Sequence, residues 1–284
     1  YLAPLLAASE APRRLYDLEF RAFSNIRHDR LLDGVETDER RSGAGLTLGS
    51  RLLNLKAPHA LRLSAGIRYE STSLENSALA QEAEDLTFLR LGAIYEWRHT
   101  YRWPSLTARV APSVDLAYAV AGGDRSFVRP GIEATLHQRF LNRWESHFNF
   151  TGGTLDRHVP SFEQWSLGGE ATLRGFSEDA FLGRHMAALQ SEIWMPLFYA
   201  RSEGAPSLPA PEPRVSRFLK GVVFMDAGTI SGTSEGSREG ALGAGVGLRF
   251  FVPRNPLVLK LDYGWGFGAP EEGSHFYFSL GYRP

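Results

Sequence analysis

The stretch ALRLSAGIRYE, residues 60–70, alternates apolar and polar side chains residue by residue. Successive side chains of a β-strand point to opposite faces, so this period predicts a strand with one apolar and one polar face. The same alternation recurs over residues 86–98, 257–265 and 275–282. Weaker examples occupy most of the remaining chain, and we expect twelve strands in all, the other eight lying near residues 15–27, 42–54, 105–121, 127–140, 144–154, 185–198, 217–229 and 240–251.

The polar faces of these strands decide between two all-β architectures. A soluble β-sandwich also alternates, but its centre is dry, and ionised groups are costly to bury there. Here the polar faces carry charges of both signs in nearly every strand, among them Arg62, Glu133 and Lys260. A water-filled lumen holds such charges, and strands of about 10 residues cross a bilayer when tilted. The sequence therefore predicts an all-β transmembrane antiparallel β-barrel of about 12 strands over residues 15–284.

Composition sets further bounds. No run of 18 uncharged apolar residues exists among the 284, which excludes a transmembrane helix. The net charge of -1 gives no electrostatic case for nucleic-acid binding, and the absence of cysteine excludes disulfides and thiolate metal sites. An apolar barrel exterior implies contact with outer-membrane lipid and lipopolysaccharide, so we expect a location in the bacterial outer membrane.

Two segments do not follow the barrel pattern. Residues 1–14 do not alternate, and we expect them to form an N-terminal linker or a plug segment. The chain begins with Tyr1, which indicates processing or a fragment and leaves an upstream domain possible. Residues 200–216 are long and proline-rich where a short turn is expected, a composition that favours an extended segment.

Residues 166–183, SLGGEATLRGFSEDAFLG, are followed by LQSEIWMPL at 189–197. Together they resemble the barrel of the outer-membrane protein insertase and two-partner-secretion transporter superfamily. Three later blocks agree in the same order: GVVFMDAGTI at 221–230, the glycine-rich hairpin at 240–266, and HFYFSLGY at 275–282. The resemblance covers about residues 144–284.

This resemblance implies that the loop at 168–183 folds back into the lumen. Arg174 would be the arginine of the loop tip, and Asp226 its acceptor on a neighbouring strand. The period of two independently places Asp226 on the lumen face, where a bidentate Arg–carboxylate bond can hold a loop in one pose. The complete set expected in this lumen-loop lock is Arg174, Gly175, Phe176, Asp226, Gly228 and Glu192.

The chain also departs from the family pattern. The typical family barrel has sixteen strands, an alternative count that we keep open, whereas five strands follow the loop here and only seven precede it. The periplasmic repeat domains that usually receive clients are not seen before the barrel. The chain closes on Tyr282-Arg283-Pro284 in place of a terminal Phe.

The leading functional expectation is assistance in the insertion or translocation of polypeptides. Its basis would be a weakly paired lateral seam between the first and last strands, because an unpaired strand edge accepts a strand from a client. The alternatives are a barrel anchor or export pore for an upstream enzymatic domain such as a phospholipase, and a passive pore. A homo-oligomer is also possible. The residues expected at the seam are Asp17, Glu19, Phe276, Phe278 and Tyr282.

Nothing in the sequence predicts catalysis or a cofactor. Gly232-Thr233-Ser234-Glu235-Gly236 matches a nucleophile-elbow pattern, but it lies in a polar loop with no helix after it. The histidines do not show the helical spacing of a zinc site, so no metal site is expected; they include His59, His99, His137, His147, His185 and His275.

Overall fold

The computed structural model describes the strands and the long internal loop of the chain. The described residues are 16–32, 35–53, 58–75, 82–99, 105–119, 126–140, 144–156, 159, 161–197, 218–232, 238–252, 255, 257–268 and 273–282. The expected linker or plug at 1–14 and the proline-rich segment at 200–216 lie outside these residues. No described helix has the length and apolar character needed to cross a membrane.

Twelve strands form one antiparallel sheet, and each pairs with its neighbour in the chain order β1-β2-β3-β4-β5-β6-β7-β10-β11-β12-β13-β14. This count confirms the twelve-stranded prediction. The strands are β1 (Tyr16–Leu32), β2 (Val35–Leu53), β3 (His59–Glu75), β4 (Glu82–His99), β5 (Ser105–Ala119), β6 (Ser126–Phe140), β7 (Trp144–Thr154), β10 (His185–Pro196), β11 (Leu219–Ser231), β12 (Arg238–Phe251), β13 (Leu257–Phe267) and β14 (Ser274–Tyr282).

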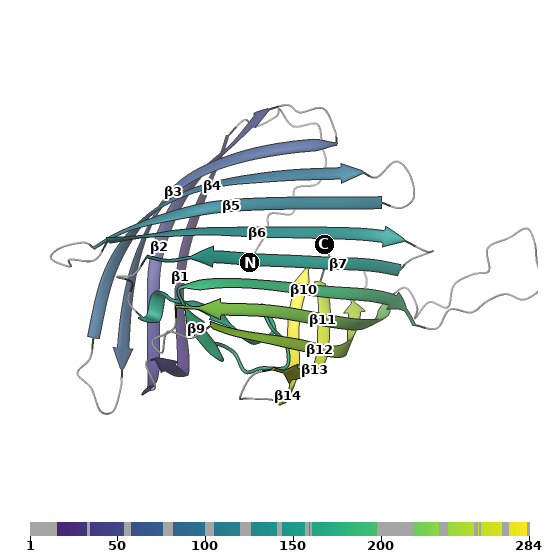
Figure 1. Cartoon of the computed structure of the whole chain (residues 1–284). Coiled ribbons are helices and arrows are strands. Elements are labelled where there is room, and N and C mark those ends of the chain that lie inside the picture. The colour runs from purple at the N-terminus through teal and green to yellow at the C-terminus, as the bar shows by residue number, and fades with distance from the viewer. Residues whose placement is uncertain are drawn as a thin grey trace, which may run out of the picture.

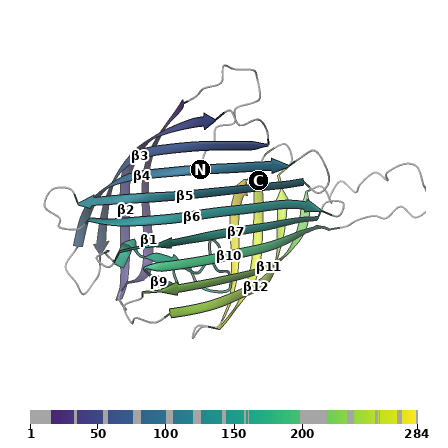
Figure 2. The same cartoon turned by 45° about the horizontal axis from the view of Figure 1, so that its top comes forward.

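The sheet is rolled into a barrel. Figures 1 and 2 show the purple first strands and the yellow last strands running steeply behind the teal middle strands, so that the sheet encloses an interior. Within the described pairings, β1 and β14 are the two ends of the strand order. The segment between β7 and β10 lies in the interior and carries η1 (Ser161–Glu163), β8 (Trp165–Leu167) and β9 (Phe181–Gly183).

The two faces of the sheet differ as the alternation predicts. Large apolar side chains on the outer face are exposed, for example Leu48, Ile67 and Met225. Charged side chains on the inner face are buried, for example Asp115, Arg249 and Asp262. Such burial needs partners, and the inner charges meet across strands, as Arg90 does with Asp115 at 2.6 Å. The barrel therefore has an apolar exterior for lipid and an ion-paired interior.

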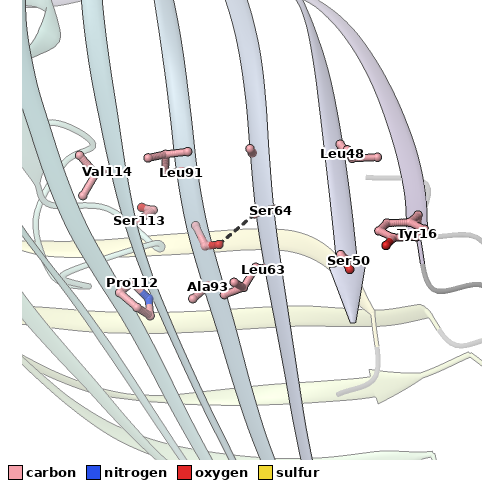
Figure 3. Close-up of a pocket in the computed structure, with 12 residues that line it drawn as sticks. Tyr16, Leu48, Ser50, Leu63, Ser64, Leu91, Ala93, Pro112, Ser113 and Val114 are labelled. Carbon is pink, nitrogen blue, oxygen red and sulfur yellow. Dashed lines mark hydrogen bonds between the residues drawn. The ribbon is translucent and has the colours of Figure 1, made fainter. Parts of the chain in front are cut away.

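An open depression of about 520 Å³ interrupts the outer face over β1–β5. Figure 3 shows that its side chains come from neighbouring strands, with Leu63 and Leu91 among the larger ones and Ala93 among the smaller. Small residues between large ones on one face leave such hollows because nothing fills the space beside them. The depression belongs to the exposed apolar surface, and in a bilayer that surface faces lipid.

The first strands are longer than the alternation of apolar residues indicates. A long polar loop was expected at 28–41, but β1 continues to Leu32 and β2 begins at Val35. Strand β2 has 19 residues, while β14 has 9. The reason is that a strand beyond the bilayer needs no apolar outer face, so the hydrogen-bonded ladder continues through residues of mixed charge such as Asp38-Glu39-Arg40-Arg41.

Candidate functional site: the lumen loop and its lock

The loop tip is a compact turn built on glycines. β8 and β9 pair antiparallel, with Leu167 opposite Phe181, and so bring the two ends of the intervening segment together. Gly168, Gly169 and Gly175 have φ angles of 130°, 79° and 101°, which disfavour side chains. The Thr172 hydroxyl accepts a bond from the Gly168 N–H at 2.9 Å and donates one to the Gly168 carbonyl at 2.8 Å. The tip is therefore pre-shaped before it meets the barrel wall.

Arg174 projects from this tip onto Asp226 of β11. Its Nε donates to Asp226 Oδ2 and its Nη2 to Asp226 Oδ1, both at 2.8 Å, which is a bidentate pair. Its backbone N–H also donates to Asp226 Oδ2 at 3.1 Å. The guanidinium lies over the ring of Phe224, with its Cζ 3.6 Å from the ring centroid. One residue of the wall thus fixes both the main chain and the side chain of the tip.

A second arginine extends this pair into a network. Arg174 Nη1 donates to Glu192 of β10 and, at 3.2 Å, to Asp262 of β13. Arg249 of β12 donates to both oxygens of Asp262 at 2.5 and 2.9 Å, and to Glu192 at 3.0 Å. Two guanidinium groups and three carboxylates therefore share one buried site, with a formal charge of 2 − 3 = −1.

The charge state of the tip arginine follows from this surrounding. Burial works against its charged form, but the hydrogen bonds to Asp226 and the negative charge of Glu192 raise the pKa of the Arg174 guanidinium above its ordinary value. The side chain stays charged at any pH at which the protein is folded. Arg174 therefore contributes a permanent positive charge to the lock.

Glycines on the inner face of β12 and β13 provide the surface on which the tip lies. A Cβ added at Gly243 would lie 1.9 Å from the Arg174 carbonyl oxygen. A Cβ at Gly266 would lie 2.6 Å from the Gly175 carbonyl oxygen, and one at Gly264 would lie 3.0 Å from the Gly175 nitrogen. Main chain thus packs on main chain, which only residues without a side chain allow.

The tip also bonds to β14, the last strand of the sheet. The Gly175 N–H donates to the Tyr277 hydroxyl at 2.9 Å, and that hydroxyl donates to the Phe176 carbonyl at 2.6 Å. His275 Nδ1 lies 3.1 Å from the Gly175 carbonyl, and the Ser279 hydroxyl donates to Glu170 at 2.5 Å. Three consecutive inward positions of β14 therefore hold the loop from one side.

The other end of the loop is anchored on β2 and β6. Glu163 of η1 accepts bonds from Arg41 of β2 at 2.8 Å and from Arg129 of β6 at 3.0 Å. The Arg129 guanidinium lies 4.2 Å from the ring centroid of Trp165. Between the two anchors the loop buries apolar side chains against the inner wall, among them Leu167, Leu173 and Phe176. The loop thus crosses the lumen from β2 to β14.

The structure brings most of the expected lock residues together. Arg174, Asp226 and Glu192 form one network, and Gly175 and Phe176 lie at the tip beside β14. Gly228 has a different neighbour from the one expected. A Cβ at this position would meet the Leu167 side chain at 2.6 Å, so the glycine leaves room for Leu167 and not for Arg174.

The residues expected at the seam lie on the two end strands of the sheet. Asp17 pairs with Arg62 of β3 and Glu19 with Arg21, and the carboxyl-bearing side chains are 54% and 51% exposed. Phe276 and Phe278 are 65% and 66% exposed on the outer face of β14. Tyr282 pairs with Leu257 through its main chain. The strands β1 and β14 differ in how far their inner side chains are buried. Nearly every described side chain of β1 is exposed on both faces, whereas the inward side chains of β14 are partly buried.

Sequence reasoning did not assign Arg249 or Asp262 to the lock. It also missed Tyr277 and the glycine surface. A signal for the glycines exists in AGVG and YGWG, since glycines at every second position mark one face of a strand. No such signal joins Arg249 to Asp262, because the cross-strand offset between them depends on the register.

Fold and loop together define an outer-membrane β-barrel whose lumen holds an inward-folded, arginine-locked loop. The family model for the Omp85 superfamily domain matches residues 11–283, and the chain belongs to this superfamily. The superfamily comprises transporters and insertases of the bacterial outer membrane, and membership places this chain in that membrane.

Solved structures with the same fold support this assignment. BamA from Haemophilus ducreyi, solved without its POTRA domains 1–3, has a TM-score of 0.64 and 15% identity, with 94% of this chain and 59% of that chain covered. CdiB from Acinetobacter baumannii has a TM-score of 0.68 and 16% identity, covering 94% and 47%. CdiB from Escherichia coli has 0.67 and 16%, covering 93% and 49%. The chain thus spans roughly half the length of these proteins. A search of the curated proteins finds no match.

Proposed function

We propose that this barrel assists the insertion or translocation of polypeptides at the outer membrane, and that it does so through the seam between β1 and β14. The observation that carries the proposal is the attachment of the loop tip to β14 through Gly175, Phe176 and Tyr277. The loop is held by the barrel wall and is also bonded to the last strand. It therefore couples the position of the loop in the lumen to the position of β14 at the seam.

The two end strands have the properties that such a seam requires. Strand β14 pairs with β13 along one edge, and β1 pairs with β2 along one edge. The other edge of each of these two end strands makes no hydrogen bonds to its sequential neighbour. Free edge groups accept a strand from another chain through main-chain hydrogen bonds. In this proposal β1 is the more easily displaced partner, because its inner face has Asp17, Glu19 and Arg21 in exposed positions.

The steps of the mechanism follow from these contacts. A client strand pairs with one open edge, and the seam widens while β14 remains fastened to the loop tip. The Arg174 network keeps the tip in place, so the strand that moves is β1. The apolar outer side chains of both strands, including Leu18 and Phe278, would contact lipid and lipopolysaccharide and receive the apolar face of the client.

The test is a covalent lock on the seam. The chain contains no cysteine, so a single cysteine pair can be introduced. One cysteine replaces Leu18 or Phe20 of β1, and the other replaces Phe276 or Phe278 of β14. We expect the protein to accelerate the folding of a urea-unfolded eight-stranded barrel protein into phosphatidylcholine vesicles. Cross-linking the seam should abolish the acceleration, and reduction should restore it.

A matched cross-link inside the sheet serves as the control. Leu136 of β6 and Phe148 of β7 are opposite each other in the register and lie on the outer face. A disulfide between cysteines at these positions should leave the acceleration unchanged. Full acceleration with the seam cross-linked would exclude the seam mechanism.

A further inference from the structure

A second polar cluster lies in the lumen on β6 and β7, and it takes no part in the loop lock. His137 of β6 and His147 of β7 are directly opposite each other in the register. Glu145 precedes His147 by two residues and therefore points to the same face of the strand. The three side chains meet next to the turn that joins the two strands, at the end of the barrel opposite the entry of the loop.

The ligand atoms of this triad converge on one point. Glu145 Oε2 lies 3.7 Å from His137 Nε2 and 3.5 Å from His147 Nε2. One ligand atom from each of the three residues lies within 4.8 Å of the others. In a tetrahedral site with metal–nitrogen bonds of about 2.0 Å, ligand atoms are separated by roughly 3.3 Å. The two imidazole rings are stacked at 4.2 Å between centroids, so both side chains must turn before their nitrogens can bind one ion.

The imidazole nitrogens that face this point have no hydrogen-bond partner within the described part of the chain. His137 Nε2 and His147 Nε2 are both buried and unbonded, and the His147 side chain is only 10% exposed. Their distances to Glu145 exceed the roughly 2.7–3.2 Å of a good hydrogen bond. Two buried nitrogens left unbonded and aimed at the same carboxylate oxygen are costly, and a bound cation would satisfy both.

The other oxygen of Glu145 is already occupied. Lys220 Nζ of β11 lies 2.8 Å from Glu145 Oε1, and Arg139 Nη2 lies 3.2 Å from the same atom. These two cations orient the carboxylate and leave Oε2 facing the imidazoles. The ring of Trp194 stacks on His147 at 4.1 Å between centroids. Fixed ligands of this kind are typical of built metal sites.

We propose that His137, Glu145 and His147 bind one divalent transition-metal ion, with solvent completing the coordination. Two imidazoles and one carboxylate favour Zn²⁺, Ni²⁺ or Cu²⁺, whereas Mg²⁺ and Ca²⁺ prefer all-oxygen sites. The bound ion joins β6 to β7. It gives a bonding partner to both imidazole nitrogens and to the Glu145 oxygen that they face. This proposal does not depend on the role of the seam.

The test is titration of the whole chain, folded in detergent micelles and freed of metal, with Zn²⁺ alone in an isothermal calorimeter. We expect one saturable site per barrel that excess Mg²⁺ does not displace. Glu145→Gln and His147→Asn should each weaken Zn²⁺ binding by at least about 10-fold. His99→Asn, at an exposed histidine near the end of β4, is the matched control and should leave the affinity unchanged.

A measurement on the unchanged protein covers the case in which a variant fails to fold. With one equivalent of Cu²⁺, the electron paramagnetic resonance spectrum should show coupling to imidazole nitrogens. The proposal is overturned if the wild type has no saturable Zn²⁺ site, if the Cu²⁺ spectrum lacks imidazole coupling, or if folded Glu145 and His147 variants retain wild-type affinity.

Discussion

At the scale of single residues, the loop is held by a charge that has no access to water. Arg174 is 1% exposed and Asp226 is fully buried. Taking such charges out of water is costly, and the cost is offset here because each guanidinium N–H that faces the network has a carboxylate acceptor. Removal of one partner would leave an uncompensated buried charge, which typically destabilises a protein by roughly 3–5 kcal/mol.

The glycine surface gives a prediction at this scale that leaves every charge in place. Gly243→Ala would put a methyl group on the Arg174 carbonyl oxygen, so the tip must lift from β12. We expect a loss of about 1–3 kcal/mol in guanidinium chloride unfolding in micelles, as for overpacked cores. Trypsin should also begin to cleave after Arg174.

The matched control for this prediction lies on the same strand. A Cβ at Gly240 would meet nothing closer than 3.8 Å, so Gly240→Ala should keep both the stability and the resistance to trypsin. Equal behaviour of the two variants would show that the tip does not depend on close contact with β12.

The residues of the lock differ in how far sequence predicts them. Asp226 could be placed on the lumen face because counting by two along its strand puts it on the same face as Lys220 and Gly228, and the resemblance supplied Arg174 as its partner. Gly228 was expected in the lock and lies against Leu167, because sequence order does not reveal that Leu167 of β8 folds back over β11. The His137–Glu145–His147 cluster was missed because metal-ligand spacing was sought on helices, whereas across strands the signal is a register and a separation of two residues.

At the scale of elements, β14 is held on its inner side by the loop as well as by β13. Tyr277 both accepts from Gly175 and donates to Phe176, so one hydroxyl satisfies two main-chain groups of the tip. On β1 the corresponding inner positions bear exposed charges, and these pair with side chains of the same sheet. The two end strands are therefore unequal in how firmly the interior holds them.

Tyr277→Phe tests this attachment. The substitution keeps the ring and removes the hydroxyl, which leaves the Gly175 N–H and the Phe176 carbonyl without their partner. We expect a local cost of about 1–3 kcal/mol, seen as faster hydrogen–deuterium exchange at the Gly175 amide and along β14. Tyr118→Phe, at an exposed tyrosine, should leave exchange in these segments unchanged, and slow exchange in both variants would contradict the attachment.

The strands were predicted more fully than the loops. All twelve segments of the alternation correspond to strands, since an apolar face toward lipid requires the period of two wherever the chain lies in the bilayer. Outside the bilayer this requirement ends while the ladder of hydrogen bonds continues. The end of β1 and the beginning of β2, on either side of their connection, therefore lie beyond the strands expected near residues 15–27 and 42–54. The small β8–β9 hairpin has strands of three residues, too short for any period to show.

At the scale of the whole molecule, the loop crosses the lumen and joins strands that are far apart in the strand order. Glu163 is bonded to β2 and β6, Arg174 to β10, β11 and β13, and the tip to β14. A lumen that is obstructed by a loop conducts ions less well than an open channel. Ion conductance therefore separates a gated transporter from a passive pore.

Conductance in a planar bilayer measures this closure. We expect the wild type to conduct weakly and Arg174→Ala to raise the mean conductance, because loss of the guanidinium leaves Asp226, Glu192 and Asp262 with only Arg249 to balance them, a formal charge of 1 − 3 = −2 beneath the tip. Arg184→Ala, at an arginine of the same loop that donates to the Gly232 carbonyl, is the control and should behave as the wild type. A large conductance that is the same in all three proteins would favour the passive pore.

The unequal strand lengths make the rim of the barrel lopsided. At about 3.3 Å per residue, the 19 residues of β2 extend roughly 60 Å, and the 9 residues of β14 extend roughly 30 Å. A hydrocarbon layer of about 30 Å leaves much of β2 above the membrane. On one side of the cell-surface opening, a tall and stiff part of the sheet with charged side chains thus projects from the membrane. The side next to β14 is low. A macromolecule that approaches this end of the barrel would meet regular sheet on the first side and the membrane surface on the second.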